Sequence, residues 1–330
     1  MMIRKFKFRI FAVIFAAFLI SLFSNSRAIA EIIHDDADDL SQASTLPIHQ
    51  WRDDSVSPKA VLIAIHGLTL HGTLFDSYAR HLAANGVIVI APDLRGYGDW
   101  FESNERATIS YSDSEQDLDK LVVALHKRYK HLPLFCSGES LGGAMTIRLA
   151  AANPAWFDGL ILSAPAIRLS HHVPMQTLLS SIVALVKPKH RVNLSPYLQQ
   201  CAPDEQQNNW EACNDTLVRS RLSLAELRLS CSFIDATAGF VGQIPSTMPV
   251  LVLQGKEDRV LDPNGLKLLE KNLHSVDQTV QIFEHRGHIL LERKDIADET
   301  VQAVSCWLDK HCSKASANLV ATTGSATVRN

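Results

Sequence analysis

The stretch Cys136–Met145, CSGESLGGAM, places glycines at positions 138 and 142 on either side of Ser140. An apolar run typical of a buried strand, LPLFCSG (132–138), precedes the serine, and the pattern that follows predicts a helix over Leu141–Ala152. Gly-x-Ser-x-Gly between a strand and a helix is typical of a nucleophile elbow, because the two glycines allow a turn that is too tight for larger side chains. We therefore expect the Ser140 hydroxyl to stand clear of the backbone at the end of a strand, as a candidate nucleophile.

Similar apolar runs recur on both sides of this stretch and are separated by segments of helical length. Helical patterns are predicted near 75–84 and 114–128. The runs are continuously apolar, as in strands that are buried on both faces. They are AVLIAIHG (60–67), GVIVIAPD (86–93), GLILSAP (159–165), PVLVLQG (249–255) and TVQIFEH (279–285). Strands that alternate with helices predict an α/β protein with a mostly parallel sheet covered by helices on both faces.

The alternation is interrupted once, and this interruption divides the chain. Residues 167–244 contain a strongly apolar segment followed by polar, helix-compatible sequence, and a segment this long between two strands is uncommon as a bare loop. We expect it to be a helical cap inserted into a core of residues 59–166 and 245–312. Residues 31–58, which include the acidic HDDADD, are expected to be a linker or edge segment. The small polar residues of 313–330 predict a disordered tail.

The first thirty residues have the composition of a targeting segment. Four basic side chains precede the apolar run Ile10–Phe23, and Ala28 and Ala30 form an Ala-x-Ala site. This pattern predicts a secretory signal peptide, residues 1–30, that is removed after Ala30, and hence export to the periplasm or the exterior. The alternative is that the segment is retained as an N-terminal membrane anchor, although the run is short for the roughly 20 apolar residues of a span.

The net charge and the cysteines limit the expected partners. The formal charge is −3, and without residues 1–30 the chain has 27 Lys and Arg against 35 Asp and Glu, a net −8. A basic surface of the kind that binds nucleic acid is therefore not expected. An oxidising compartment would allow the closely spaced pairs Cys201/Cys213 and Cys306/Cys312 to form disulfides, whereas Cys136 lies in an apolar run and suits a buried thiol. The cysteine spacings do not resemble a zinc site.

A serine nucleophile needs a base and an acid that orients the base, and in this architecture both follow the serine along the chain. KEDRVLDP (256–263) follows one late strand and offers Asp258 and Asp262, and HRGHILLE (285–292) follows the next and offers His285 and His288. Asp258 lies on the turn after its strand, whereas Asp262 precedes a proline and suits a helix N-cap. His288 follows a glycine, which allows close approach. We favour Asp258 and His288 and expect the other two to be structural.

Two backbone amides are candidates for an oxyanion hole. HGLTLHG (66–72) follows the first clear strand, and its Leu68 amide lies where a second donor is expected. The amide of Leu141 follows the nucleophile at a helix N-terminus, where it can donate to developing negative charge. We therefore predict Leu68 and Leu141 as the two oxyanion donors.

Four other polar residues near strand ends have simpler interpretations. His66 lies before the serine in the chain, so it suits a buried histidine that organises its loop better than a catalytic base. Asp93 and Arg95 are expected to fix a turn as a charge pair. Glu139, next to the nucleophile, is expected to orient its neighbours.

Together the motifs HGLTLHG, APDLRGYG, GESLGGAM, LQGKEDRVLDP and EHRGHILLE resemble the monoacylglycerol lipase/lysophospholipase branch of the α/β-hydrolase superfamily. The resemblance runs from about residue 60 to residue 308, and it implies a triad of Ser140, Asp258 and His288 with oxyanion donors at Leu68 and Leu141. The family usually has histidine where this chain has Glu139.

The resemblance implies a serine hydrolase that cleaves carboxylic esters of monoacylglycerol or lysophospholipid type through an acyl-enzyme, a mechanism that requires neither metal nor cofactor. The partner is then a small-molecule acyl ester or lipid. The apolar stretch Met175–Val186 either serves an acyl chain and transient membrane contact or packs on the core. Two other hypotheses stay open: a peptidase or amidase on the same scaffold, and a catalytically silent binding domain.

Overall fold

The computed structural model describes residues 32–102, 108–170, 175–187, 190–201 and 211–326. The signal peptide expected at 1–30 lies outside these residues. Among the helices of the described ranges, none combines the length and the apolar character needed to cross a membrane.

A sheet of eight strands forms the centre of the molecule, in the order β1-β2-β4-β3-β5-β6-β9-β10. From β4 to β10 all neighbours are parallel, whereas β2 is antiparallel to both β1 and β4. The strands are β1 (Ile33–Asp36), β2 (Ile48–Arg52), β3 (Ala60–Ile65), β4 (Val87–Pro92), β5 (Leu134–Glu139), β6 (Gly159–Ser163), β9 (Val250–Gly255) and β10 (Gln278–Phe283). The α/β class predicted from the apolar runs is confirmed.

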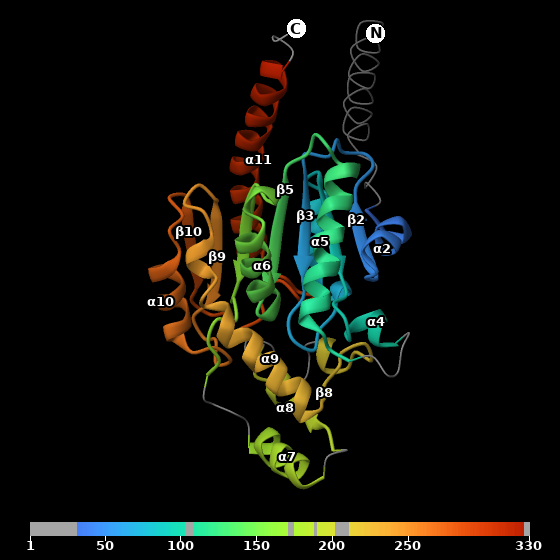
Figure 1. Cartoon of the computed structure of the whole chain (residues 1–330), viewed down its shortest axis with the longest axis vertical. Helices are drawn as coiled ribbons and strands as arrows, with labels where there is room; N and C mark the ends of the chain where they lie inside the picture. Colours follow the sequence, from blue (N-terminus) through green and yellow to red (C-terminus); the bar gives the residue numbers. More distant parts are fainter. Residues whose placement is uncertain (1–31, 103–107, 171–174, 188–189, 202–210, 327–330) are drawn as a thin grey trace, which may run out of the picture.

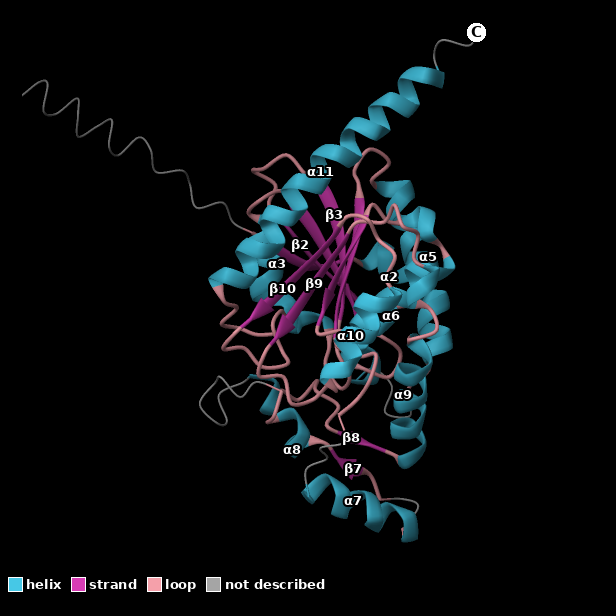
Figure 2. Cartoon of the chain, turned by 90° about the vertical axis from the view of Figure 1, so that its left-hand side faces the viewer, coloured by secondary structure: helices cyan, strands magenta, loops and turns pink. Residues whose placement is uncertain are grey.

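Helices cover both faces of this sheet, as Figures 1 and 2 show. Successive side chains of β3 point to opposite faces, so Val61 packs in the core layer that includes α5 and α6, and Leu62 packs in the layer that includes α3 and α11. The longer helices are α2 (Asp38–Ser44), α3 (Asp76–Ala83), α5 (Tyr111–Arg128), α6 (Leu141–Ala152), α10 (Pro263–Asn272) and α11 (Asp298–Ala326). Burial on both faces explains why β3, β4, β5 and β6 are continuously apolar. Short elements complete the core: α4 (Gly98–Glu102), η1 (Gly72–Phe75) and η2 (Pro154–Trp156).

Residues 32–58, expected to be a linker or an edge segment, form one edge of the sheet. Their acidic stretch forms β1 and the first turn of α2, where Asp38 and Asp39 lie near the positive end of the helix dipole. The charged side chains of β1 face solvent on the outer strand, as is common at sheet edges. Trp51 of β2 is fully buried, and its indole N–H donates to Asp76 Oδ1 at 2.8 Å, which anchors the segment to α3.

We name residues 167–244 the cap segment, and its described parts lie beyond one end of the sheet (Figures 1 and 2). A capping box starts its longest helix, α9: the Ser223 hydroxyl accepts from the Glu226 amide and the Glu226 carboxylate accepts from the Ser223 amide. The described elements are α7 (Met175–Val186), β7 (Val192–Asn193), α8 (Ser195–Leu198), η3 (Glu211–Cys213), β8 (Arg221–Leu222), α9 (Leu224–Thr237) and η4 (Val241–Gln243).

The C-terminal segment corrects an expectation. Disorder was predicted for 313–330, but α11 continues through it to Ala326. Extending an existing helix requires no new nucleation, and the alanines of this segment are the best helix formers.

The cysteines correct another expectation. All six lie in the described part of the chain, and neither Cys201/Cys213 nor Cys306/Cys312 forms a disulfide there. Cys306 is exposed and Cys312 is buried on the same helix α11. Six residues correspond to about 240° of helical rotation at 3.6 residues per turn, so the two side chains point to different sides. Cys136 is buried, as its apolar run predicted.

Candidate active site

The turn between β5 and α6 holds Ser140 in an unusual backbone conformation. Its φ is 55° and its ψ is −114°, a region that costs a residue with a side chain about 1–3 kcal/mol. Two backbone hydrogen bonds of 2.9 Å hold it there: the Ser140 amide donates to Ser163 O, and the Ala166 amide donates to Ser140 O. The turn is therefore fixed by the neighbouring strand end, as a nucleophile elbow requires.

The glycines around Ser140 are needed for close approach of the backbone. A Cβ atom on Gly138 would lie 2.1 Å from Gly142 O, and one on Gly142 would lie 1.8 Å from Ile65 O. Side chains are excluded at both positions because the first turn of α6 lies directly against the ends of β3 and β5. The sequence argument for a tight turn thus has a steric cause in the fold.

Ser140, His288 and Asp258 form one hydrogen-bonded chain. His288 Nε2 lies 2.8 Å from Ser140 Oγ, and His288 Nδ1 lies 2.8 Å from Asp258 Oδ2. A carboxylate only accepts hydrogen bonds, so Nδ1 carries the proton and Nε2 accepts from the serine hydroxyl. The loops after β9 and β10 bring the aspartate and the histidine to the end of β5. This arrangement can transfer the serine proton to the imidazole.

Asp258 is held as a charged acceptor. Its Oδ1 accepts from the amides of Val260 (2.8 Å) and Leu261 (3.1 Å), and its Oδ2 also accepts from Gln254 Nε2 (2.9 Å). Burial opposes ionisation, but the positive charge of His288 and these hydrogen bonds outweigh it, so the pKa of Asp258 is lowered.

The same pairing acts on His288 in the opposite direction. Burial favours the neutral imidazole, but the charge and hydrogen bond of Asp258, together with the charge of Glu139, raise the pKa of His288 above its usual value. The imidazolium that forms on proton transfer is therefore stabilised.

The two residues that were expected to be structural make other contacts. Asp262 caps α10, where its Oδ1 accepts from the Asn264 amide at 2.9 Å. The His285 side chain is 94% exposed and lies 3.7 Å from a Glu257 carboxylate oxygen.

The loop after β3 lies beside the serine. Gly67, Leu68 and Ser140 line the same small cavity, and Thr69 has a positive φ of 72° that turns the loop. Leu141, the other candidate donor, is the first residue of α6 and is fully buried. The two amides proposed for an oxyanion hole thus belong to segments that flank the serine.

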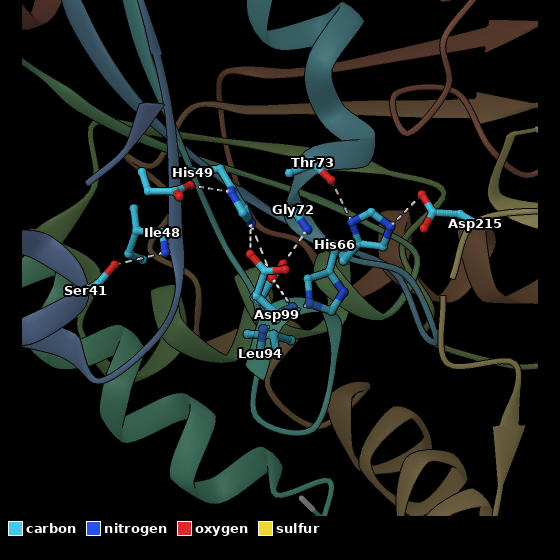
Figure 3. Close-up of polar contacts among 12 residues, drawn as sticks. Ser41, Ile48, His49, His66, Gly72, Thr73, Leu94, Asp99 and Asp215 are labelled. Carbon is cyan, nitrogen blue, oxygen red and sulfur yellow. Dashed lines mark hydrogen bonds and ion pairs between the residues drawn. The ribbon is translucent and has the colours of Figure 1, made fainter. Parts of the chain in front are cut away.

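His66 holds this loop in place. It is fully buried, its Nδ1 donates to Gly67 O at 2.8 Å, and its Nε2 accepts from the Leu94 amide at 3.0 Å (Figure 3). Burial lowers the pKa of His66 to about 4, so the imidazole is neutral. Both ring nitrogens are occupied, which agrees with a loop-organising role.

The charge pair expected between Asp93 and Arg95 is a wrong prediction. Arg95 pairs with Asp117 instead, and its Nε donates to Asp117 Oδ2 at 2.5 Å. Asp93 Oδ1 accepts from the Gly72 amide at 2.7 Å, and Oδ2 accepts from the Asp99 amide at 2.8 Å (Figure 3). His49, which sequence reasoning did not single out, lies 3.3 Å from Asp93 Oδ2. The network supports the loop that begins at His66.

The same network has the residue types of a metal site. Within the described ranges, His49, Asp93 and Asp99 are the one group whose ligand atoms all lie within 4.8 Å of one another. Burial lowers the pKa of His49, but the hydrogen bond and charge of Asp93 outweigh it and raise that pKa, which favours the charged imidazole beside the buried carboxylate. Two backbone amides and the His49 ring thus already contact the Asp93 carboxylate.

The cap segment closes over the site. Ser140 is 9% exposed and His288 2% exposed, and the cavity beside them measures about 30 Å³. This is room for only a few water molecules and is too small for an acyl chain. The cap residues that line it are Leu169, Leu194, Tyr197, Leu198, Cys201 and Ile234.

Three cap contacts reach the site loops directly. Cys201 O accepts from the amides of His288 (2.9 Å) and Ile289 (3.0 Å), and the Arg219 amide donates to Thr69 O at 2.9 Å. The side chain of Asp215 accepts from His71 Nε2 at 3.1 Å (Figure 3). These contacts involve backbone groups or distant loops, so the sequence carried no signal for them.

Known proteins share this fold and sequence pattern. The sequence model of the family described as serine aminopeptidase, S33 (Hydrolase_4) matches residues 56–295. The monoglyceride lipase of Mus musculus is 26% identical over 272 residues, 81% of this chain and 88% of the mouse protein. The crystal structure of Paleococcus ferrophilus monoacylglycerol lipase superposes with a TM-score of 0.62 at 22% identity, over 81% of this chain and 99% of that one. A soluble variant of Saccharomyces cerevisiae monoglyceride lipase in complex with a substrate analog superposes with a TM-score of 0.64 at 18% identity, over 87% and 97%.

The parallel sheet, its helices and the elbow define an α/β-hydrolase. The chain belongs to the serine aminopeptidase S33 family, in a branch that resembles the monoacylglycerol lipases, which confirms the resemblance of its motifs. Several of the relatives that it matches are named lipases or esterases.

Proposed function

We propose that the protein hydrolyses carboxylic esters through an acyl-enzyme on Ser140. His288 Nε2 takes the hydroxyl proton as Oγ attacks the ester carbonyl, and it returns that proton to the leaving alcohol. Water then attacks the acyl-enzyme by the same route and releases the acid. Asp258 orients the imidazole and stabilises its charged form. The observation that carries this proposal is the pair of 2.8 Å hydrogen bonds that link the three side chains.

The amides of Leu68 and Leu141 are the proposed donors to the oxyanion that forms when the carbonyl is attacked. Both belong to segments beside Ser140, and the second lies at the start of a twelve-residue helix whose dipole favours negative charge. Each such donor typically contributes about 3 kcal/mol to transition-state stabilisation.

Esters of the monoacylglycerol or lysophospholipid type are the proposed substrates. The site cavity is lined mainly by aliphatic side chains from the cap and the core, which suits an acyl chain. The relatives named monoglyceride lipase support the same class.

The cap segment is the proposed lid, because a cavity of about 30 Å³ has to enlarge before such a substrate enters. Its helix α7 suits contact with a lipid surface. Thr177 and Ala184 of this helix are buried, whereas Leu179 and Leu185 point to solvent with 55% and 72% exposure. The exposed Lys187 follows the helix and would favour anionic headgroups.

Residues 1–30 support a proposal of export by a cleaved signal peptide, with retention as an N-terminal membrane anchor as the alternative. N-terminal sequencing of the protein isolated from its native cell separates the two. A mature chain beginning at Glu31 is expected, and an intact leader in the membrane fraction would favour the anchor.

A peptidase or amidase is the second candidate function, and the description of the matching family is the observation that favours it. A triad alone does not distinguish an ester from an amide. A silent binding domain is less well supported, because it would not need the complete hydrogen-bonded chain.

The test is hydrolysis by the mature protein of p-nitrophenyl esters with short to long acyl chains, of monoacylglycerols, and of aminoacyl-nitroanilides, with Ser140→Ala as the control. Ester turnover that disappears in the control is the expected result. Turnover of anilides alone would move the protein to the peptidases. A folded protein that neither turns over a substrate nor reacts with a fluorophosphonate would overturn the catalytic proposal in favour of a binding domain.

A further inference from the structure

Two buried carboxyl groups lie together behind the candidate nucleophile. Glu139 precedes Ser140 at the end of β5, and Glu292 lies four residues after His288. Both are fully buried, and the Glu292 amide donates to Glu139 Oε2 at 2.9 Å. Two carboxylates buried side by side repel each other, which favours a proton on one of them.

The hydrogen bonds around Glu139 identify it as the ionised member. Its Oε1 accepts from Ser163 Oγ at 2.6 Å and from the Leu290 amide at 2.8 Å. The amide of Leu291 lies 3.1 Å from both carboxylate oxygens, and the Glu292 amide donates to Oε2 at 2.9 Å. One hydroxyl and three amides thus converge on this carboxylate, which is the usual environment of a buried charge.

The environment of Glu292 is different. The Gly67 amide donates to its carboxyl oxygens, at 3.1 Å from Oε1 and 3.0 Å from Oε2. Burial and the charge of Glu139 raise the pKa of Glu292 well above its usual value. Since one hydroxyl and three amides already donate to Glu139, Glu292 is the member of the pair that is better placed to carry a proton.

We propose that Glu292 is a positioning residue that acts as a neutral carboxylic acid: its hydroxyl donates to Glu139, and its carbonyl oxygen holds the Gly67 amide next to the proposed oxyanion donor Leu68. This proposal rests on the proposed ester hydrolysis and adds a residue to it. The pair connects three segments that meet only in the folded protein: the loop after β3, the nucleophile elbow, and the loop that carries His288.

The neutral state matters for the chemistry. An ionised Glu292 would place a second negative charge beside the Gly67–Leu68 loop, where negative charge develops on the oxyanion. A neutral acid supplies the same hydrogen bond without that repulsion. The packing is also close, because a Cβ atom on Gly67 would lie 3.1 Å from Glu292 Oε2. Loss of this side chain would therefore free the loop to shift.

The kinetic test compares Glu292→Gln, Glu292→Leu and the exposed matched control Glu284→Leu. Glutamine keeps a donor for Glu139 and an acceptor for Gly67, so kcat should stay within about threefold of the parent. Leucine removes both, and kcat per active site should fall roughly 10²-fold, the effect of losing one oxyanion donor, with KM nearly unchanged. Active sites are counted with a fluorophosphonate, so a smaller folded fraction does not count as a lower kcat.

The proposal is overturned if Glu292→Gln loses as much activity as Glu292→Leu, because the charge would then be required. It is also overturned if a folded Glu292→Leu protein keeps the kcat of the parent.

An infrared measurement tests the protonation state without any substrate. The difference spectrum between the parent and Glu292→Gln at neutral pH should contain the C=O stretch of a protonated carboxylic acid, shifted in D₂O. Its absence would overturn the proposal even if the enzyme is active. The band together with an unreactive Ser140 would instead contradict ester hydrolysis and leave the neutral acid established.

Discussion

His288 Nε2 lies 2.8 Å from Ser140 Oγ although 148 residues separate the two in the chain. The contact exists because β5 and β9 both pair with β6, and β10 pairs with β9, so their parallel carboxyl ends open on the same edge. A small set of loops at this edge therefore brings together a nucleophile, a base and an acid.

The chain offers matched pairs that test the triad. Asp258→Asn should lower kcat by roughly 10⁴-fold, because an amide no longer fixes the Nδ1 proton of His288. Asp262 lies four residues further along the chain and is the N-cap residue of α10. Asp262→Asn should leave kcat unchanged, because asparagine is also a good N-cap residue. Ester hydrolysis with counted active sites measures both. Equal losses in the two variants would contradict the assignment of the acid.

The pH dependence of activity follows from the raised pKa of His288. The base works as the neutral imidazole, so kcat/KM should fall as the pH drops, with a midpoint above the usual 6.5. The effect of His288 on stability changes with pH in the opposite direction to its effect on activity. Because its pKa is raised in the folded protein, His288 stabilises the fold below pH 6.5, and this stabilisation is lost as the pH rises through the folded pKa.

A pH–rate profile on a neutral ester measures this midpoint, and one below 6.5 would count against the prediction. In Glu139→Gln the midpoint should move down, because the charge of Glu139 contributes to the raised pKa. Glu257→Gln, on the exposed surface, is the control and should not move it.

Replacing exposed leucines of α7 should weaken contact with lipid and spare the chemistry. Leu179→Ser with Leu185→Ser should lower binding to anionic phospholipid vesicles about tenfold or more, since each buried side chain of this size contributes about 1.5–3 kcal/mol. Turnover of a soluble short-chain ester should stay the same. Vesicle sedimentation measures the binding. The control Val276→Ser removes an exposed apolar side chain, 84% exposed, outside the cap. Equal weakening by this control would contradict a role for α7.

The glycines of the chain should differ sharply in their tolerance of a methyl group. Gly142→Ala should lower the free energy of unfolding by about 1–3 kcal/mol and disturb the elbow, because its Cβ would lie 1.8 Å from Ile65 O. A Cβ atom on Gly242 would lie 3.7 Å from its nearest neighbour, Asn272 O, so Gly242→Ala should change the free energy of unfolding by less than about 1 kcal/mol. Chemical denaturation of both variants gives the comparison. A stable, active Gly142→Ala protein would mean that the turn relaxes.

Local patterns were enough for most of the fold. The apolar runs predicted β3, β4, β5, β6, β9 and β10, and the helix predicted over Leu141–Ala152 has these same bounds in the structure. They gave less for residues 32–58, where the edge was expected but its two strands were not, and they were wrong for the C-terminal tail. β1 and β2 are short strands with polar and charged side chains, and the strand order that pairs them at the edge cannot be read from their own residues. The polarity of the C-terminal tail predicted disorder, but α11 extends into the tail as far as Ala326.

The sequence by itself determined the class of the fold, the position of the elbow and the order serine, acid, base, because burial and turn geometry depend on neighbouring residues. Only the tertiary structure decided which aspartate and which histidine meet Ser140, and that Cys201 and Glu292 hold the loops around it. The amide of Gly67 and the carboxyl of Glu292 are 225 residues apart. Contacts at such separations depend on the order of the strands and on how closely their loops approach. No local periodicity encodes those two properties.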